Sequence, residues 1–266
     1  AEGGSGIGSY RYGYFKQNIE SIEAILMTGE KKVFSGNELD LIYATQGTIG
    51  LITKVTIWLR DALPIAPYLV HFPNMDQYEK FLIQLTKTEN KIYNLQHFLG
   101  DSLNRRFQAI KSGRGVACTL YHNQENFLKL EWEQSFDQHG VYAAIAVEGE
   151  EDPQWKTFLP EYNGKLESSV LAQFIWDERF YPMREKRLGP SLIPSEAIMS
   201  VQSLEAVYRE ARNLIPDVSL EGTLVNQEEV VLLGFVLHDE RTFSFAVDYV
   251  KSLALMGIIE KHGGRL

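Results

Sequence analysis

Two glycine-rich stretches near the start of the chain have the residue types best suited to a ligand site. The first comprises Gly3, Gly4, Gly6 and Gly8, and the second contains Gly47 and Gly50. Glycine has no Cβ and can adopt positive φ, so its backbone can come close to a flat or phosphorylated ligand. The spacing therefore predicts a binding surface made largely of backbone.

The first stretch does not have the dinucleotide-binding pattern of a Rossmann fold. That pattern requires a strand, the spacing G-x-G-x-x-G and then a helix. Ser9 stands where the third glycine belongs, and Gly13 interrupts the segment in which the helix would begin. A flexible linker is the alternative. The aromatic residues between Tyr10 and Phe15 favour contact with a ligand, because such side chains tend to be buried.

The second stretch, Gln46 to Thr53, has two interpretations that the local sequence leaves open. Gly47 can end a short helix before a strand. Alternatively, the turn can present backbone groups to the base of a nucleotide. In either case, the alternation of side chains from Gly50 to Arg60 predicts a strand.

Arginines in the segment 167–188 are the best candidates for binding an anionic substrate. A carboxylate substrate calls for an arginine fork, since a guanidinium group binds a carboxylate in a bidentate manner. The favoured alternative is an exposed helix face on which these arginines pair with Glu178 and Glu185. The candidates are Arg179, Arg184 and Arg187.

Histidine and cysteine give no sign of a metal site or a reactive thiol. His71, His97 and His122 lie in or beside predicted strands without metal-ligand spacing, so we expect surface or core histidines. Cys118 is the only cysteine, which excludes an internal disulfide, a cysteine-rich zinc site and an iron–sulfur cluster held by this chain alone. We expect no metal, and no residue type or spacing identifies a catalytic group.

The composition is typical of a globular protein with an acidic surface. Of the 266 residues, 44% are hydrophobic and 23% are charged, and the formal net charge is −9. This charge argues against binding to nucleic acid, which requires a basic face. The apolar run Val230 to Leu237 is far shorter than the roughly 20 residues that span a bilayer. No leader is visible before Ala1, so a cytoplasmic location is expected.

Two prolines in the segment 61–67 mark a domain boundary. We therefore predict one domain over residues 1–62 and a second over residues 63–266. The elements expected in the first domain are strands at 19–27, 32–34 and 50–60 and a helix at 38–43.

Strands and helices alternate in the second domain. Two β-α-β runs follow one another, which predicts an antiparallel sheet with helices on one face in the ferredoxin-like manner, and hence an α+β fold. A long helical stretch is expected at 167–188, with a kink at Pro182 because proline lacks a backbone donor. The other expected elements are strands at 68–72, 92–98, 115–121, 141–147, 196–201, 218–224 and 229–237 and helices at 75–87, 103–110, 125–139, 204–214 and 241–256.

In this order and spacing, the two glycine-rich stretches resemble the FAD-binding domain of FAD-linked oxidases. That family includes vanillyl-alcohol oxidase, D-lactate dehydrogenase and the glycolate oxidase flavoprotein subunit. The similarity in motif detail covers residues 1–60, and it extends more loosely over the remainder as the family's α+β cap domain. The matching segments are Gly3 to Gly13, Lys16 to Met27, Thr28 to Glu30, and Gln46 to Lys54, with Gln46 where the family usually has glutamate.

The resemblance implies an FAD site and a place for the chain within a longer fold. The chain would be the C-terminal portion, a partial FAD-binding subdomain followed by an antiparallel-sheet cap domain of ferredoxin-like character. The subdomain with the pyrophosphate-binding loop would precede Ala1. The glycine-rich opening would lie against the flavin ring and ribityl chain, and the second stretch would face the adenine. The implied cofactor-binding residues are Gly3, Gly4, Gly6, Ile7 and Gly8, and then Gly47, Gly50, Leu51 and Ile52.

The resemblance also implies an activity, the oxidation of a small hydroxylated substrate such as a 2-hydroxy acid by hydride transfer to flavin. The expected partners are that small molecule and an electron acceptor. Residues 218–230 contain no histidine, unlike the metal site of several hydroxy-acid members, and Glu260 to Gly263 only partly matches the family's late Glu-His-Gly element. The alternative is a non-catalytic α+β fragment that binds a ligand or another protein without flavin.

Overall fold

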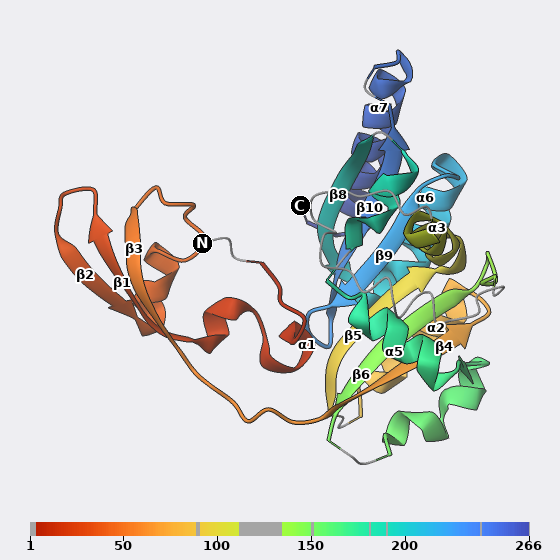
Figure 1. The fold of residues 1–266 in the computed structure, drawn as a ribbon, viewed down its shortest axis with the longest axis horizontal. Helices are drawn as coiled ribbons and strands as arrows, with labels where there is room; N and C mark the ends of the chain where they lie inside the picture. The colour runs from red at the N-terminus through yellow and green to blue at the C-terminus, as the bar shows by residue number, and fades with distance from the viewer. Residues whose placement is uncertain are drawn as a thin grey trace.

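The chain forms two separate β-sheets joined by an extended segment (Figure 1). The computed structural model describes residues 4–88, 91–111, 135–149, 152–180, 182–189, 191–239 and 241–265. A three-stranded sheet has the order β2-β1-β3, and a seven-stranded sheet has the order β7-β4-β6-β5-β9-β10-β8. Residues 58–64 connect them without regular structure.

The three-stranded sheet contains only antiparallel pairs. It consists of β1 (Ile19–Leu26), β2 (Lys31–Ser35) and β3 (Gly50–Ile57), and the 3₁₀ helix η2 (Gly36–Leu41) follows β2. One face is buried under η2 and the following turn, with a small core made of Ile19, Ile22, Ala24, Phe34, Leu39 and Ile42. The short helices α1 (Ser9–Tyr12) and η1 (Phe15–Asn18) lead into β1.

The seven-stranded sheet is built from two split β-α-β units. In the first, helix α2 (Met75–Leu85) links β4 to β5, and β6 lies between these two strands. In the second, α6 (Leu204–Leu214) links β8 to β9, and β10 lies between them. The units join where β5 pairs with β9, so the ferredoxin-like α+β expectation is confirmed. The strand bounds are β4 (Ile65–Phe72), β5 (Ile92–Leu99), β6 (Val141–Glu148), β7 (Lys165–Leu166), β8 (Ser191–Ser200), β9 (Ser219–Leu224) and β10 (Glu229–His238).

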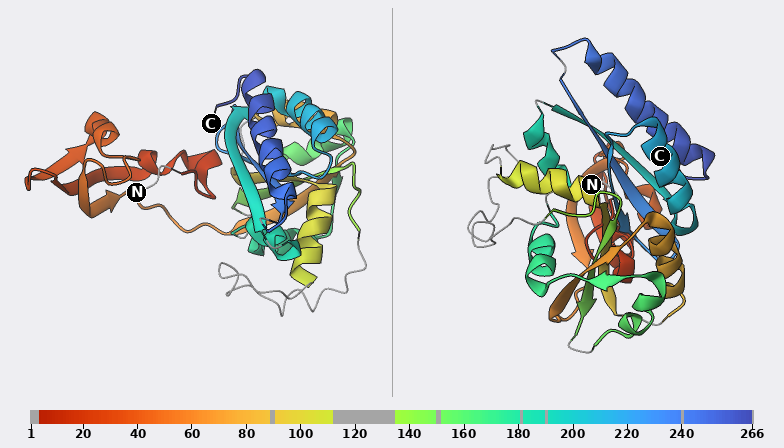
Figure 2. Two further views of the ribbon diagram at one scale, coloured as in Figure 1. Left: turned by 90° about the horizontal axis from the view of Figure 1, so that it is seen from above. Right: turned by 90° about the vertical axis from the view of Figure 1, so that its right-hand side faces the viewer.

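Helices cover both faces of this sheet, so the prediction of helices on one face was wrong (Figure 2). Helices α2, α6 and α7 (Ser244–Lys261) pack on one face, and α3 (Gly100–Lys111) and α5 (Ser169–Asp177) pack on the other. The reason is visible in β6, whose side chains are apolar in both directions. Val141 and Ala143 face the first layer, whereas Tyr142 faces the second.

The long helix predicted at 167–188 is two separate pieces. Helix α5 ends at Asp177, and a 3₁₀ helix, η6 (Pro182–Leu188), begins at the proline that was expected to break the stretch. The Arg106 guanidinium donates a hydrogen bond of 2.7 Å to the carbonyl of Glu178, immediately after α5. This bond gives a partner to a carbonyl that would have accepted a backbone hydrogen bond if the helix had continued.

Other boundaries differ in detail. The last helix begins at Ser244 and continues to Lys261, later than the predicted 241–256. The strand predicted at 115–121 and the first ten residues of the helix predicted at 125–139 lie outside the described residues, and residues 135–139 form no helix. Among the described residues, no helix combines the length and apolar character needed to cross a membrane.

Candidate functional site

A cavity of about 380 Å³ lies where the N-terminal segment meets the seven-stranded sheet. We call it the junction cavity. Its walls come from the opening loop, from the segment that leaves β3, and from the start of β5. The lining residues are Gly6, Gly8, Ser9, Tyr12, Gly13, Phe15, Asn18, Trp58, Leu59, Arg60 and Tyr93.

The opening loop is attached to the sheet by direct contacts. The Asn94 side-chain amide donates a hydrogen bond of 2.9 Å to the backbone carbonyl of Ile7. A Cβ at Gly8 would lie 2.6 Å from Cε2 of Tyr93, so glycine is required there for close packing against that ring. By contrast, Gly4 has open space around it, and a Cβ at Gly6 would meet only Ser9 Oγ at 4.0 Å.

The buried carboxylate of Glu148, at the end of β6, binds three groups from the N-terminal part of the chain. The Tyr12 hydroxyl donates to it at 2.6 Å, and the Arg11 guanidinium lies 2.8 Å away. On its other oxygen, Arg60 Nη1 donates at 2.5 Å. Charged hydrogen bonds of this kind are among the stronger ones in proteins, so Glu148 fixes the wall of the cavity.

Arginines lie over aromatic rings at this wall and beside it. The Arg60 guanidinium lies over the rings of Tyr12 and Tyr93, 4.5 and 4.8 Å from their centroids. Tyr93 also makes an edge contact with Trp176, at 6.1 Å between centroids. Arg179 lies over the Trp176 ring at 3.9 Å. Among the three predicted arginines, Arg179 is therefore the one whose described contacts lead to the cavity wall.

Burial lowers the pKa of Arg179, and the nearby Asp177 carboxylate and Tyr93 partly offset the effect. The Arg179 Nη1 donates to the carbonyl of Trp176 at 2.6 Å, and the guanidinium also lies over the Phe180 ring. The side chain is only partly buried, so a cation remains accessible beside an aromatic surface.

Arg184 and Arg187 are buried, which differs from the exposed face of charge pairs expected from the sequence. The expected pairing of Arg184 with Glu178 is present in bidentate form, with bonds of 2.6 and 2.8 Å. Because Glu178 occupies two of the Arg184 donors, binding of a substrate carboxylate there would require breaking this pair. The short η6 turns both arginines inward, whereas a continuous helix would have spread them over one face.

The second predicted stretch lies in the three-stranded sheet and contributes no residue to the junction cavity. Gly47 has φ of +82° in a turn, and the preceding 3₁₀ helix ends at Leu41, so the interpretation of Gly47 as the end of a helix was wrong. A Cβ at Gly50 would lie 2.5 Å from the carbonyl oxygen of Ile25, so glycine allows β1 and β3 to approach. Leu51 is exposed and Ile52 packs on the small core. Gly3 lies outside the described residues.

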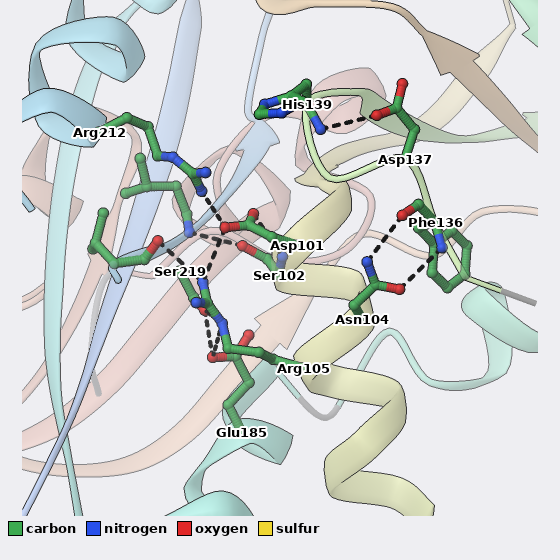
Figure 3. Close-up of polar contacts among 12 residues, drawn as sticks. Asp101, Ser102, Asn104, Arg105, Phe136, Asp137, His139, Glu185, Arg212 and Ser219 are labelled. Atoms are coloured by element: carbon green, nitrogen blue, oxygen red, sulfur yellow. Dashed lines mark hydrogen bonds and ion pairs between the residues drawn. The ribbon is translucent and has the colours of Figure 1, made fainter. Parts of the chain in front are cut away.

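A second group of charged residues surrounds the first turns of α3 (Figure 3). The Arg105 Nε donates to Ser219 Oγ at 2.8 Å and lies 3.5 Å from the Glu185 carboxylate, which accepts a hydrogen bond from Ser219. Asp101 at the start of α3 pairs with Arg212 of α6. These contacts connect α3, η6, β9 and α6, and we call them the α3 charge network.

Two carboxyl groups of this region titrate near neutral pH. Burial raises the pKa of Glu185 to about 7, and the Arg105 guanidinium partly offsets the effect. Burial also raises the pKa of Glu221 to about 7, although Arg106 Nη1 lies 3.2 Å from its carboxylate. The Glu185 carboxylate also raises the pKa of Glu221, and the Asp101 carboxylate raises the pKa of Glu185, as expected for like charges in a buried region.

His97 has a structural role in the core of the large sheet. His97 is fully buried between two tyrosines, with Nδ1 at 3.1 Å from the Tyr78 hydroxyl and Nε2 at 2.6 Å from that of Tyr208. Burial lowers the pKa of His97 to about 3, so the ring is neutral. Among the described residues, no group of three or more His, Cys, Asp or Glu is placed to hold a metal. His122 lies outside them.

The sequence reasoning missed Glu148, Arg60 and Tyr93, the residues that organise the junction cavity. Arg60 and Tyr93 lack any local motif. One feature of the sequence could have indicated Glu148: it is a charged residue at the end of an otherwise apolar strand. A buried carboxylate requires positive or hydrogen-bonding partners, but the sequence does not identify them.

This arrangement, a small antiparallel sheet joined to a large sheet of two split β-α-β units, is a fold found in the FAD-binding oxidase family. Two enzymes of that family with solved structures are similar to it. Alkyldihydroxyacetonephosphate synthase matches with a TM-score of 0.66 and 16% sequence identity, over 99% of this chain and 52% of that protein. P-cresol methylhydroxylase with substrate bound matches with a TM-score of 0.62 and 14% identity, over 97% of this chain and 59% of that protein.

The chain thus spans little more than half the length of these enzymes. At sequence identities of 14% and 16%, the likeness establishes the fold and leaves the activity open. No protein-family model matches the sequence, and no curated protein matches it.

Proposed function

We propose that this chain is the C-terminal portion of an FAD-dependent oxidoreductase that oxidises a small hydroxylated substrate, such as a 2-hydroxy acid. The observation that carries the proposal is the fold shared with two FAD-binding oxidase-family enzymes over 97% or more of the chain. The order of the two glycine-rich stretches supports the same assignment from the sequence. The two lines are independent, because the sequence similarity to these enzymes is very low.

The residues around the junction cavity fit the ring-bearing part of a flavin. Tyr12, Tyr93 and Trp58 provide aromatic surface, and Arg60 adds positive charge beside them. The open space at Gly6 leaves the backbone of the opening loop accessible. A volume of about 380 Å³ falls within the range of about 300 to 1,000 Å³ typical of small-molecule sites.

In this proposal, the chain's own residues bind and orient, and a bound flavin would supply the hydride acceptor. Gly4, Gly6 and Gly8 would present backbone to the ring, and Tyr93 would limit access of water from the sheet side. The stretch from Gly47 to Ile52 is proposed for the adenine end, where exposed Leu51 offers apolar surface. Arg179 is the candidate for the substrate carboxylate, because it is a partly exposed cation beside Trp176.

The test is a titration of the purified chain with FAD, in which binding is measured by the change in tryptophan fluorescence. We expect binding that Tyr93→Leu and Arg60→Gln weaken by about tenfold, consistent with the loss of roughly 1.4 kcal/mol of contacts each. Lys165→Gln is the control, because this exposed residue lies in β7, away from the cavity. If FAD neither binds nor raises the melting temperature of the chain, the flavin-free alternative is favoured.

The substrate class has its own test. With FAD bound and oxygen removed, a 2-hydroxy acid should bleach the flavin absorbance. Arg179→Gln should raise the concentration of the 2-hydroxy acid that gives half-maximal bleaching, without lowering the affinity for FAD. If Arg179→Gln leaves this concentration unchanged, the proposal that Arg179 binds the substrate carboxylate is wrong, even if the flavin assignment holds.

A further inference from the structure

Glu178 directly follows helix α5 and precedes Arg179, and two arginines hold it in place. Arg106 Nη2, from α3, donates a hydrogen bond of 2.7 Å to the backbone carbonyl of Glu178. The Glu178 carboxylate accepts two hydrogen bonds from Arg184 of η6, at 2.6 and 2.8 Å. All three side chains are buried. The peptide between Glu178 and Arg179 is therefore fixed by contacts from α3 and η6.

Arg179 itself is held mainly by its own neighbours in the chain. Its Nη1 donates to the carbonyl of Trp176, and its guanidinium lies over the Trp176 and Phe180 rings, 3.9 and 4.3 Å from their centroids. Its buried Nε has no hydrogen-bond partner among the described residues. The position of the guanidinium over Trp176 thus depends on the backbone that carries it, and this backbone includes the Glu178 carbonyl.

Arg106 joins that carbonyl to a carboxylate on β9. Its Nη1 lies 3.2 Å from the Glu221 carboxylate, and its guanidinium lies 5.3 Å from the centroid of the Phe98 ring. One buried guanidinium thus connects β9 to the end of α5 through two of its nitrogens. The attraction between Arg106 and Glu221 is largest when Glu221 is ionised, particularly in a region of low dielectric. The orientation of Arg106 therefore depends on the charge of Glu221.

The other groups that face Glu221 come from η6, α6 and the neighbouring strands. Glu185 of η6 is a second acid close enough to act on it. Tyr208 of α6 is affected in turn, because its pKa is raised by burial and further by the Glu221 carboxylate. The residues paired with Glu221 in the sheet, Phe98 of β5 and Leu233 of β10, are uncharged. The charge of Glu221 is thus balanced mainly between one arginine and one acid.

This balance places the ionisation of Glu221 in the neutral range. Burial raises the pKa of Glu221 to about 7, the Arg106 guanidinium partly offsets the rise, and the Glu185 carboxylate adds to it. Glu221 is therefore mostly neutral at pH 6 and mostly ionised at pH 8.

We propose that Arg106 is a positioning residue for Arg179, under the control of the charge on Glu221. When Glu221 is ionised, it holds Arg106 on the Glu178 carbonyl, and Arg179 then covers the Trp176 ring. When Glu221 is neutral, Arg106 loses its charged partner and the peptide before Arg179 is held less firmly. The inference rests on the proposed function in one respect: Arg179 binds the substrate carboxylate, so the affinity for substrate is higher above neutral pH than below it.

Acrylamide quenching of Trp176 fluorescence tests this link on the full chain, without FAD or substrate. The Trp176 signal is the difference between the chain and its Trp176→Phe variant, followed from pH 5.5 to 8.5. Because Arg179 covers the ring only when the link is formed, the quenching constant should fall at least twofold as the pH rises, with a midpoint near 7.

Three variants, each made with and without Trp176→Phe, identify the groups. Glu221→Gln should remove the transition and keep the quenching constant at its low-pH value, because glutamine does not ionise. Arg179→Ala should also remove it, since the group that covers the ring is lost. Glu185→Gln is the matched control: it should keep the transition and move its midpoint to lower pH, because it removes a like charge that raises the pKa of Glu221.

The proposal is overturned if the quenching constant of Trp176 is the same at pH 6 and pH 8, or if Glu221→Gln retains the transition. The comparison at two pH values needs no change in the buried charges. It therefore gives an answer even if Glu221→Gln does not fold.

A second measurement separates this inference from the proposed function. In the chain loaded with FAD, the concentration of a 2-hydroxy acid that gives half-maximal bleaching should fall by up to about tenfold from pH 6 to pH 8, because only the fraction with ionised Glu221 binds well. Glu221→Gln should show no such fall. If the quenching transition is present but no 2-hydroxy acid bleaches the flavin, the link holds and the proposed substrate is wrong. If bleaching occurs at a concentration independent of pH and the transition is absent, the link is wrong and the proposed function stands.

Discussion

Arg60 Nη1 lies 2.5 Å from Oε1 of Glu148, and this ion pair joins the segment that leaves the small sheet to the last residue of β6. The same carboxylate accepts a hydrogen bond from the Tyr12 hydroxyl. One buried acid therefore holds both the entry to and the exit from the N-terminal sheet. The position of the junction cavity depends on it.

Replacing Glu148 with glutamine should loosen the N-terminal part of the chain. Arg60 and Arg11 are partly exposed and can hydrate after the change, so we expect a loss of about 1 to 3 kcal/mol, typical of a hydrogen bond to a charged group. Limited proteolysis should cleave faster within residues 58–64. Glu210→Gln removes an exposed carboxylate that binds Lys261 and should change the cleavage rate little. Equal protection of both variants would contradict the role of Glu148.

Replacing Gly222 with alanine should strongly destabilise the large sheet. The new Cβ would lie 2.2 Å from Cε1 of His97 and 2.9 Å from Val230 Cγ1. His97 cannot move freely because Tyr78 and Tyr208 hold its two ring nitrogens. We expect a loss of about 2 to 3 kcal/mol from overpacking, measured by urea denaturation. Gly4→Ala, where the space is open, should be neutral.

Stability should fall as the pH rises from about 4.5 to about 7, through the contribution of Glu185 and Glu221. Their pKa values are raised to about 7 in the folded chain, so the folded state binds more protons than the unfolded state in this window. The free energy of unfolding then decreases with pH. Each pKa unit corresponds to about 1.4 kcal/mol.

The measurement is the difference in melting temperature between the wild-type chain and Glu221→Gln, followed from pH 4.5 to 8. The variant should gain relative stability as the pH rises. His97 acts in the opposite direction, because its pKa falls to about 3 on burial and protonation of the unfolded chain lowers stability below about pH 6.5. Taking the difference between two proteins that both contain His97 removes this contribution. A flat difference curve would contradict the raised pKa of Glu221.

Replacing Arg184 alone should lower the free energy of unfolding more than replacing Arg184 and Glu178 together. Arg184→Met leaves the Glu178 carboxylate buried without its bidentate partner, and we expect a loss of about 3 to 5 kcal/mol. The double variant Glu178→Leu/Arg184→Met should recover a large part of this loss. Urea unfolding of the two single variants and the double variant gives the coupling energy. Purely additive losses would show that the pair does not act as a unit.

Sequence periodicity predicted most of the secondary structure of the large sheet, because short-range rules govern it. The alternation of β-α-β units, the helix capped by Asn74 and the ferredoxin-like character follow from local patterns of apolar residues. The break in the stretch 167–188 was also indicated by Pro182. The second helical layer was not predicted, although β6 is apolar on both of its faces.

The sequence by itself determined the α+β class, the strand and helix types, and the glycine-rich stretches that suggest a flavin fold. Only the tertiary structure decided which of these residues share a site. It placed Gly6 and Gly8 beside Tyr93 and Arg60, and it turned Arg184 toward Glu178. The physical reason is range: hydrophobic periodicity acts over a few residues, whereas the partners of a buried charge such as Glu148 come from 88 and 136 positions away.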